Sequence, residues 1–402
     1  MSSWPVFDDE MIEGVAAVLR SGRVNAWTGP EVGAFERAYA EHLGRRRAIA
    51  LANGTVALEL ALRAFGVGPG DDVVVTPRSF VASAACAPLV GARPVFADVD
   101  PVSQNLTAET IEAALTPRTR AVVVVHLAGW PAEMEPILRL CRSRGVVVIE
   151  DCAQAHGAEI AGAPVGSFGD AAAFSFCQDK IISTGGEGGL LALDDEAAWA
   201  RAWAYKDHGK AHAALFAREH PPGFRWLHEG VGTNWRMTGM QAALGAIQLD
   251  RLSDWRAKRT RNAGILLDAI DATPGLRAHE PWAGRVHAYY RLYAFVLPER
   301  LKPGWSRDRI LRELAARGAP AMTGACGEIY REKVFAAAGW APERGLPNAR
   351  ALAETSLAFP VDPTLDAETM RGVGATLGEV MSAAADAPAD RGPTRRMRSA
   401  AQ

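Results

Sequence analysis

A lysine stands where an apolar run meets a glycine-rich loop. The segment FSFCQDKIISTGGEGG (174–189) places Lys180 shortly after residues typical of the end of a buried strand. Apolar surroundings remove part of the hydration of an amine, so we expect the pKa of Lys180 to fall. Such a lysine is a usable nucleophile toward aldehydes and a proton shuttle, which predicts Schiff-base chemistry.

A carboxylic acid follows a second apolar run. The residues VVVIE (146–150) lead directly into Asp151. In an open parallel sheet, ligands bind at the carboxyl ends of the strands, so this acid and Lys180 are expected at the same sheet edge. Asp151 could instead only cap the turn that follows, and its own segment does not exclude that role.

A lysine and an acid at one site are the pair that pyridoxal 5′-phosphate (PLP) requires. The lysine forms the imine, and the acid keeps the pyridinium nitrogen protonated so that the ring can act as an electron sink. The PLP phosphate favours free N–H groups at the start of a helix. ANGTVAL (52–58) supplies Gly54 for close backbone approach and Thr55 for a hydroxyl, although an ordinary strand-to-helix turn explains these residues equally well.

The loop TGGEGG (184–189) resembles a nucleotide-binding loop only superficially. It does not match GxGxxG, and it precedes a strand instead of opening a helix. We therefore interpret it as flexible backbone beside Lys180.

These residues need a sheet to position them, and the pattern between residues 47 and 193 predicts one. Seven short β-rich runs alternate with helical stretches: AIALAN, DDVVVTP, RPVFADVD, TRAVVVVHLAG, RGVVVIEDC, DAAAFSFC and GGLLALDD. Between them, residues 54–72 have an apolar helical body with glycine stops, and TAETIEAALTP (107–117) opens with a threonine N-cap. This alternation predicts an α/β fold with a mostly parallel sheet and helices on both faces.

The second half of the chain has a different organisation. LDRLSDWRAKRTRNAGILLDAI (249–270) predicts a long linking helix, and YYRLYAFVLP (289–298) and SRDRILRELAARG (306–318) predict a strand and a helix of a smaller α+β domain. We expect a large domain over residues 1–250, a small C-terminal domain over 251–386, and a disordered tail over 387–402.

Composition excludes several classes of function. A net charge of -2 and a pI near 6.5 give no electrostatic basis for binding nucleic acid or an anionic membrane. Five scattered cysteines form neither a CxxC pair nor a Cys/His ligand spacing, so no metal site is expected. No signal peptide or transmembrane run is apparent, which predicts a cytoplasmic protein that acts on small molecules.

Several motifs occur in one order along nearly the whole chain: GPEVGAFERAYAEHLG, NGTVALELAL, VHLAGWPAEM, VIEDCAQAHGA, FSFCQDK followed by GGEGG, GTNWRMTGMQAALGAIQL and LPNARALAETSLAFPV. Together they resemble the DegT/StrS-type sugar aminotransferases of PLP fold type I. The resemblance implies a large domain with a mostly parallel seven-stranded sheet, a smaller C-terminal α+β domain, and PLP as the cofactor.

The resemblance also implies roles around the PLP ring. Lys180 would hold the cofactor covalently and move the proton between cofactor and substrate carbons, and Asp151 would pair with the pyridine nitrogen. Gln154, in EDCAQAHG, is similar to the family glutamine that hydrogen-bonds near the phenolic oxygen. Phe80, in PRSFVASA, stands where the family has the aromatic residue that stacks on the ring.

Four further residues are similar to the family's phosphate-binding positions. Gly54, Thr55 and Ser175 would belong to the same chain as the lysine, whereas Asn234, in GTNWRM, would reach the phosphate from the neighbouring subunit. A homodimer with shared active sites follows from the resemblance. Arg236 would either bind an anionic substrate or only hold its loop, and both interpretations remain open.

The resemblance implies transfer of an amino group, from L-glutamate, to a keto sugar attached to a nucleotide diphosphate, in the biosynthesis of polysaccharides or natural products. The alternatives are a glutamine-dependent keto-cyclitol aminotransferase, a PLP-dependent sugar dehydratase, and a regulatory protein that kept only the fold. Lys180 argues against the dehydratase, because family members that remove hydroxyls have histidine in its place.

Two segments depart from the family pattern. KIISTGGEGG (180–189) contains one glycine more than is common after the lysine, and AMTGACGEIYREKVF (321–335) stands where many relatives place a histidine or aromatic contact to the sugar. The identity of the substrate therefore remains open.

Overall fold

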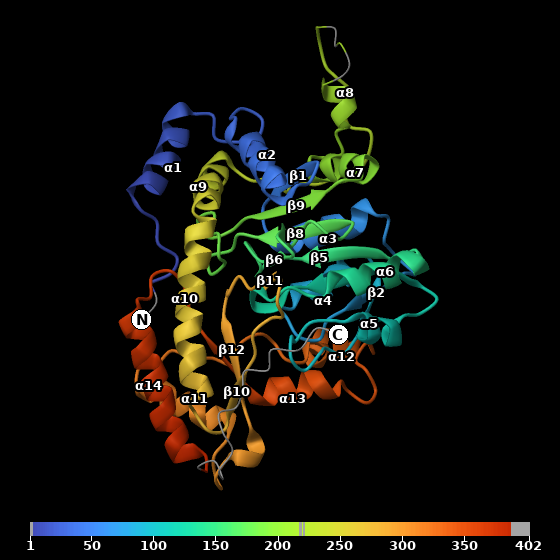
Figure 1. The fold of residues 1–402 in the computed structure, drawn as a ribbon. Helices are drawn as coiled ribbons and strands as arrows, with labels where there is room; N and C mark the ends of the chain where they lie inside the picture. The colour runs from blue at the N-terminus through green and yellow to red at the C-terminus, as the bar shows by residue number, and fades with distance from the viewer. Residues whose placement is uncertain (1–2, 217–218, 220–221, 387–402) are drawn as a thin grey trace.

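A seven-stranded sheet forms the centre of the larger part of the chain in the computed structural model, which describes residues 3–216, 219 and 222–386 (Figure 1). Its strands are β1 (Arg47–Leu51), β2 (Asp72–Val75), β3 (Arg93–Phe96), β4 (Thr119–Val125), β5 (Val147–Asp151), β8 (Ala171–Ser175) and β9 (Gly189–Leu193). Their order is β1-β9-β8-β5-β4-β2-β3; β9 runs antiparallel to β1 and β8, and the other adjacent strands pair in parallel. The predicted α/β class and mostly parallel sheet are confirmed.

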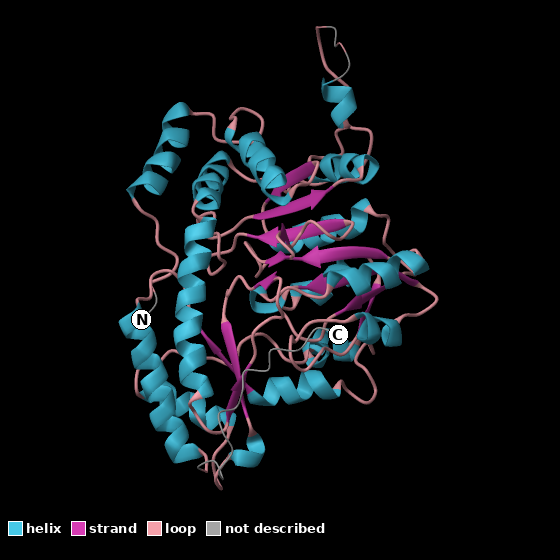
Figure 2. Cartoon of the chain, viewed as in Figure 1, coloured by secondary structure: helices cyan, strands magenta, loops and turns pink. Residues whose placement is uncertain are grey.

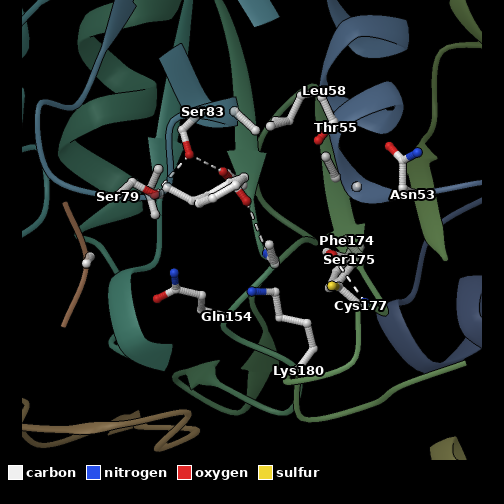
Figure 3. A pocket seen from close by; sticks show the side chains of 18 of the residues that line it. Asn53, Thr55, Leu58, Ser79, Ser83, Gln154, Phe174, Ser175, Cys177 and Lys180 are labelled. Carbon is white, nitrogen blue, oxygen red and sulfur yellow. Dashed lines mark hydrogen bonds between the residues drawn. The ribbon is translucent and has the colours of Figure 1, made fainter. Parts of the chain in front are cut away.

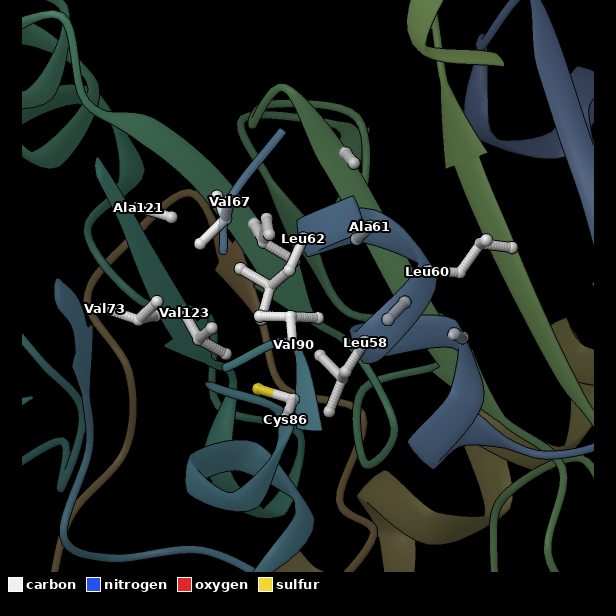
Figure 4. Close-up of a cluster of buried hydrophobic side chains, with 14 of the residues drawn as sticks. Leu58, Leu60, Ala61, Leu62, Val67, Val73, Cys86, Val90, Ala121 and Val123 are labelled. Atoms are coloured by element: carbon white, nitrogen blue, oxygen red, sulfur yellow. The ribbon is translucent and has the colours of Figure 1, made fainter. Parts of the chain in front are cut away.

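Both faces of this sheet are covered, because successive strand residues point to opposite sides. Val73 and Val75 of β2 pack into a cluster with α3 (Gly54–Ala64), α4 (Ala82–Leu89) and α7 (Glu196–Lys206), part of which Figure 4 shows. Val74 faces the other side, toward α5 (Ala108–Ala114) and α6 (Met134–Arg144). The three successive valines of β2 are therefore what a sheet buried on both faces requires.

The predicted threonine cap at residue 107 is confirmed, and a second cap, which was not predicted, stands before α3. The side chain of Asn53 accepts a hydrogen bond from the Val56 N–H at the start of α3, and Thr107 and Thr110 form a capping box at the start of α5. Both caps satisfy N–H groups that have no partner within the helix. They fix the residue at which each strand-to-helix connection ends.

The remaining helices surround the sheet and extend below it (Figure 2). They are α1 (Asp9–Ser21), α2 (Glu31–Leu43), α8 (His212–Phe216), α9 (Gly239–Asp250), α10 (Leu252–Asp271), α11 (Arg307–Ala316), α12 (Lys333–Ala337), α13 (Pro347–Thr355) and α14 (Ala367–Ala384). Within the described part of the chain, no helix combines the length and apolar character needed to cross a membrane.

A second, smaller body lies at the far end of α10, where β10 (Leu276–Ala278), β12 (Leu292–Val296) and β13 (Ser356–Phe359) form an antiparallel sheet. Apolar residues of α10, α11 and α14 pack with this sheet into a separate core. The predicted linking helix is thus α10, which follows α9 after Arg251. The division at residue 250 stays a prediction, and the predicted disordered tail lies outside the described residues.

A third sheet joins the two halves of the chain. It consists of β6 (Glu159–Ile160), β7 (Ala163–Pro164) and β11 (Arg285–Val286), in the order β11-β6-β7. Each strand has two residues, which is too short for a pattern of alternation to appear in the sequence.

Candidate active site

A cavity of about 920 Å³ opens at the carboxyl ends of β1, β5 and β8 (Figure 3). Seven of the predicted site residues line it: Gly54, Thr55, Phe80, Asp151, Gln154, Ser175 and Lys180. They come from separate strand ends and the turns after them, so the parallel sheet brings them together. Asn234 is not among the lining residues of this chain, although its neighbour Trp235 is.

Lys180 lies at the floor of the cavity, with its side chain 15% exposed. Its Nζ is 3.4 Å from Oδ1 of Asp179 and 5.0 Å from the centre of the Tyr290 ring. Burial lowers the pKa of Lys180, but Tyr290 and Asp179 outweigh burial and raise the pKa above its ordinary value. The prediction that the pKa of Lys180 falls is therefore wrong for the protein without cofactor, because the sequence did not reveal Tyr290 and Asp179 as partners.

The backbone of Lys180 is also held in place. Its N–H donates to the carbonyl of Cys177 at 3.0 Å, and its carbonyl accepts from the indole Nε1 of Trp4 at 2.8 Å. Trp4 in turn packs edge-on against Trp255 of α10. The N-terminal segment thus holds the lysine from outside the sheet, and no pattern in the sequence indicates this contact.

Asp151 is 4% exposed and is oriented by two hydrogen bonds. Its Oδ2 accepts from the Ser83 hydroxyl at 2.7 Å, and its Oδ1 accepts from the Ala153 N–H at 3.1 Å. Burial raises the pKa of Asp151, and these hydrogen bonds together with the charge of Lys180 only partly counteract it. A buried carboxylate of this kind is stabilised by a cation placed against it.

Ser83 is a site residue that the sequence reasoning missed. It stands in the first turn of α4, and its hydroxyl lies 2.9 Å from that of Ser79 as well as against Asp151. Two serines four residues apart at the start of an otherwise apolar helix were the available signal. Both side chains are labelled in Figure 3.

The start of α3 forms one wall of the cavity. Helix α3 begins at Gly54, and a Cβ atom at that position would lie only 2.6 Å from the Cβ of Ser175. Glycine is therefore required for the helix to approach β8 this closely. Gly54, Thr55 and Ser175 line the same cavity, and the start of a helix beside two hydroxyl-bearing residues is an arrangement that suits an anion.

Gln154 is held with one end of its amide toward the cavity. Its Oε1 accepts from the N–H of Ala128 at 2.8 Å, which leaves the amide NH₂ for a ligand. Ala128 has a positive φ of 58°, in a short 3₁₀ turn after β4. The neighbouring His126 accepts from the Ala132 N–H through Nδ1, which closes that turn.

Three buried residues behind this turn carry side chains of the types that bind metal ions. Donor atoms of His126, Glu150 and Cys152 lie within 4.8 Å of one another. Glu150 accepts from the N–H groups of Gly166, Phe168 and Gly169 and from Nε2 of His126. Burial raises the pKa of the Cys152 thiol well above its ordinary value, so the cluster is better explained as support for the loops beside the site.

His156 also has a supporting position. Its Nε2 lies 2.9 Å from the carbonyl of Ser175 and its Nδ1 lies 2.6 Å from the hydroxyl of Tyr39. Burial lowers the pKa of His156 to about 3, so the ring is neutral near pH 7. The side chain anchors the end of β8, and with it Ser175.

Phe80 and Asn234 occupy more open positions. Phe80 is 64% exposed at the rim of the cavity. Asn234 forms a single β-bridge with Asp207, whose carboxylate is fully buried and accepts from Nη1 of Arg236 at 2.7 Å. Of the two interpretations left open for Arg236, the contacts within this chain favour the structural one.

The two segments that depart from the family pattern both adjoin the cavity. Gly185 and Gly186 have positive φ values of 82° and 120°, and Gly186 forms a bridge with Cys177. The glycine pair therefore permits a tight return of the loop beside Lys180. From the segment 321–335, Met322, Gly324, Ala325 and Cys326 line the cavity.

The arrangement fits PLP at each of its functional groups. Lys180 supplies an amine for the aldehyde, and the buried Asp151 supplies a carboxylate for a cationic ring nitrogen. The start of α3 offers N–H groups and hydroxyls to a phosphate, and Gln154 offers an amide to the phenolic oxygen. No other described residues assemble these four features around one cavity.

Comparison with known proteins agrees with this geometry. Residues 5–378 match the DegT/DnrJ/EryC1/StrS aminotransferase family. GDP-perosamine synthase of Caulobacter vibrioides is 40% identical over 71% of this chain and 73% of its own length. L-glutamine:2-deoxy-scyllo-inosose aminotransferase of Streptomyces kanamyceticus is 37% identical over 78% of this chain and 74% of its own.

A solved structure provides the same assignment. The aminotransferase of Psychrobacter cryohalolentis superimposes with a TM-score of 0.93 at 48% identity, over 95% of this chain and 99% of that one. The match covers the large sheet and the smaller body alike. The chain therefore belongs to the DegT/DnrJ/EryC1/StrS aminotransferase family, and it is a PLP-dependent aminotransferase.

Proposed function

We propose that this aminotransferase transfers an amino group from L-glutamate to a keto sugar linked to a nucleotide diphosphate. The observation that carries the proposal is the placement of Lys180 and the buried Asp151 in one cavity of about 920 Å³. That volume is at the upper end of small-molecule sites, and it leaves space for a substrate larger than an amino acid beside the cofactor. A similar protein at 40% identity is named GDP-perosamine synthase.

In this proposal each residue has a separate task. The cofactor, when bound, supplies the electron sink that makes the α-proton of an amino acid removable. Lys180 holds the cofactor, then takes and returns that proton with its Nζ. Asp151 keeps the ring nitrogen cationic, and Ser83 orients Asp151 through the hydrogen bond at 2.7 Å.

A second candidate is amination of a keto-cyclitol with L-glutamine as the donor. A relative at 37% identity is named for that reaction, and it covers 78% of this chain. The two candidates differ in the acceptor ring and in the donor side chain. They share the cofactor and the roles of Lys180 and Asp151.

A substrate screen separates these candidates. The amine form of the enzyme is mixed with nucleotide-linked keto sugars and with keto-cyclitols, and the return of the aldehyde form is followed by absorbance. We expect return with at least one nucleotide-linked keto sugar, and return only with keto-cyclitols would favour the second candidate. Lys180→Ala, which lacks the proton-transferring amine, is the control.

We also propose a homodimer in which Asn234 completes the phosphate site of the partner subunit. Seven predicted residues line the cavity of their own chain and Asn234 does not. The segment before Asn234 includes α8, which projects away from the body in Figure 1. Nearby, Phe224, Trp226 and Val231 are 78%, 87% and 92% exposed, as expected for residues that a second copy covers.

Mixing two inactive variants tests the shared site. We expect Lys180→Ala and Asn234→Asp to complement each other, because one site of the heterodimer carries both changes and the other carries neither. Activity should rise toward about half of the wild-type value per heterodimer. Aspartate is chosen because its carboxylate repels a phosphate. Chain exchange is verified by mass spectrometry, and exchange without recovery would show that Asn234 does not act across subunits.

A further inference from the structure

The cavity contains a cation that the roles described above do not use. Among the described residues that line it, the basic side chains are Lys180 and Arg291. Lys180 is assigned to the cofactor. Arg291 also lines the cavity, but the proposed reaction gives it no role. It stands one residue before β12 and directly after Tyr290.

The geometry of Arg291 leaves its hydrogen-bond donors available. Its Nη2 is 3.9 Å from Oδ2 of Asp179, which is longer than the distance of about 2.7–2.9 Å typical of a charge-assisted hydrogen bond. The hydroxyl of Tyr290 donates to that same oxygen. Within the described chain the guanidinium group makes no hydrogen bond, although its side chain is only 21% exposed.

An arginine with a structural role has different contacts in this molecule. The Nη1 of Arg307 donates to the carbonyls of Ala353 and Ser356, both at 2.9 Å. Arg45 donates to the carbonyls of Gly166 and Gly169 as well as to a carboxylate. Arg291 lacks such bonds, but it is oriented, because its guanidinium carbon lies 5.0 Å from the centre of the Tyr290 ring.

Asp179 connects this cation to the reacting amine. Its Oδ1 is 3.4 Å from Nζ of Lys180 and its Oδ2 is 3.9 Å from Arg291. Burial raises the pKa of Asp179, but the opposing effects of Lys180, Tyr290 and Arg291 are larger. The pKa therefore lies below its ordinary value. The carboxylate of Asp179 thus lies between two cations, at 3.4 Å from Lys180 and 3.9 Å from Arg291.

We propose that Arg291 binds a carboxylate of the amino-acid donor, and that Asp179 holds the guanidinium group when no donor is present. This inference rests on the proposed function only in taking an amino acid as the donor. A guanidinium group presents paired N–H donors whose spacing matches the two oxygens of a carboxylate. An enzyme that alternates between an amino acid and a sugar benefits from an anion site that an internal carboxylate can neutralise.

Binding of glutarate to the PLP-loaded enzyme tests the inference without turnover. Glutarate has two carboxylates and no amino group, so calorimetry measures recognition alone. We expect Arg291→Gln to weaken glutarate binding by about ten- to a hundredfold, the usual effect of losing hydrogen bonds to a charged group. The absorbance of the bound cofactor should not change. Arg139→Gln is the matched control, since Arg139 is 73% exposed and, among the described residues, forms an ion pair only with Glu135.

The two half-reactions locate the effect. Arg291→Gln should slow the conversion of the enzyme to the amine form by L-glutamate. The rate at which a keto sugar returns the enzyme to the aldehyde form should stay within about twofold of the wild-type rate. An equal loss in both half-reactions, or unchanged glutarate binding, would overturn the inference. If the proposed acceptor is wrong, no keto sugar returns the wild-type enzyme to the aldehyde form. Binding of glutarate to the wild-type enzyme can still be measured in that case.

A double variant tests whether Arg291 only neutralises the charge of Asp179. If Arg291 served only to balance Asp179, then adding Asp179→Asn to Arg291→Gln would restore glutarate binding. We expect no recovery in the double variant, because the carboxylate would still lack its guanidinium partner. We further expect Asp179→Asn alone to bind glutarate at least as tightly as wild type, since it frees Arg291 from its internal anion. Recovery in the double variant would overturn the assignment.

Discussion

Replacing Lys180 with alanine is expected to lower turnover by about 10⁴-fold or more, because both the covalent anchor and the proton carrier are lost. The fold should remain intact, since Asp179 keeps its contacts to Tyr290 and Arg291. PLP should still bind without a covalent bond, through the start of α3 and Asp151. Steady-state assays of the variant and a spectral titration with PLP measure these two outcomes.

Two controls make this prediction specific to the amine. Lys258→Ala removes an exposed lysine of α10 whose ion pair within the described chain is with Asp254, and this variant should retain wild-type turnover. A small primary amine added to Lys180→Ala should restore part of the activity, which a purely structural loss would not allow. Borohydride treatment of wild type should label Lys180 with the reduced cofactor, and a label on another lysine would contradict the assignment.

The sheet and the residues at its edge were predictable because their signals are local. Each of the seven strands is a short apolar run bounded by turn residues, and both faces of the sheet are buried. Asp151 ends β5, so its position directly after an apolar run placed it at the carboxyl edge, whereas Ser175, which ends β8, was assigned to the site by the family resemblance. The Thr107 cap at the start of α5 is equally local.

The contacts that orient these residues were not predictable, because they join distant parts of the chain. Ser83 and Asp151 are 68 positions apart, Tyr290 and Asp179 are 111 apart, and Trp4 and Lys180 are 176 apart. The wrong expectation for the pKa of Lys180 has this origin. Burial acts as expected, but Tyr290 and Asp179 outweigh it. Only tertiary structure shows which charges surround a buried group.

Replacing Asp151 with asparagine is expected to lower turnover by roughly 10²–10³-fold while the protein still binds PLP. Losing one partner of a buried charge pair costs about 3–5 kcal/mol, and each tenfold change in rate corresponds to about 1.4 kcal/mol. An amide cannot keep the ring nitrogen cationic, so the electron sink is weakened. Asp151→Glu should retain part of the activity. If Asp151→Asn had the same turnover as wild type, Asp151 would act only as a cap of the turn that follows it.

Stability without the cofactor provides an independent test of the same assignment. Burial raises the pKa of Asp151, and a carboxyl group whose pKa is raised by folding stabilises the protein at low pH and loses that contribution as the pH rises through the folded-state pKa. Near neutral pH, the cofactor-free protein therefore holds a carboxylate that burial disfavours. Asp151→Asn should unfold at an equal or higher urea concentration than wild type without PLP, and at a lower one with PLP. Exposed Asp254→Asn should change neither midpoint, and a large loss of stability without PLP would mean that Asp151 supports the fold itself.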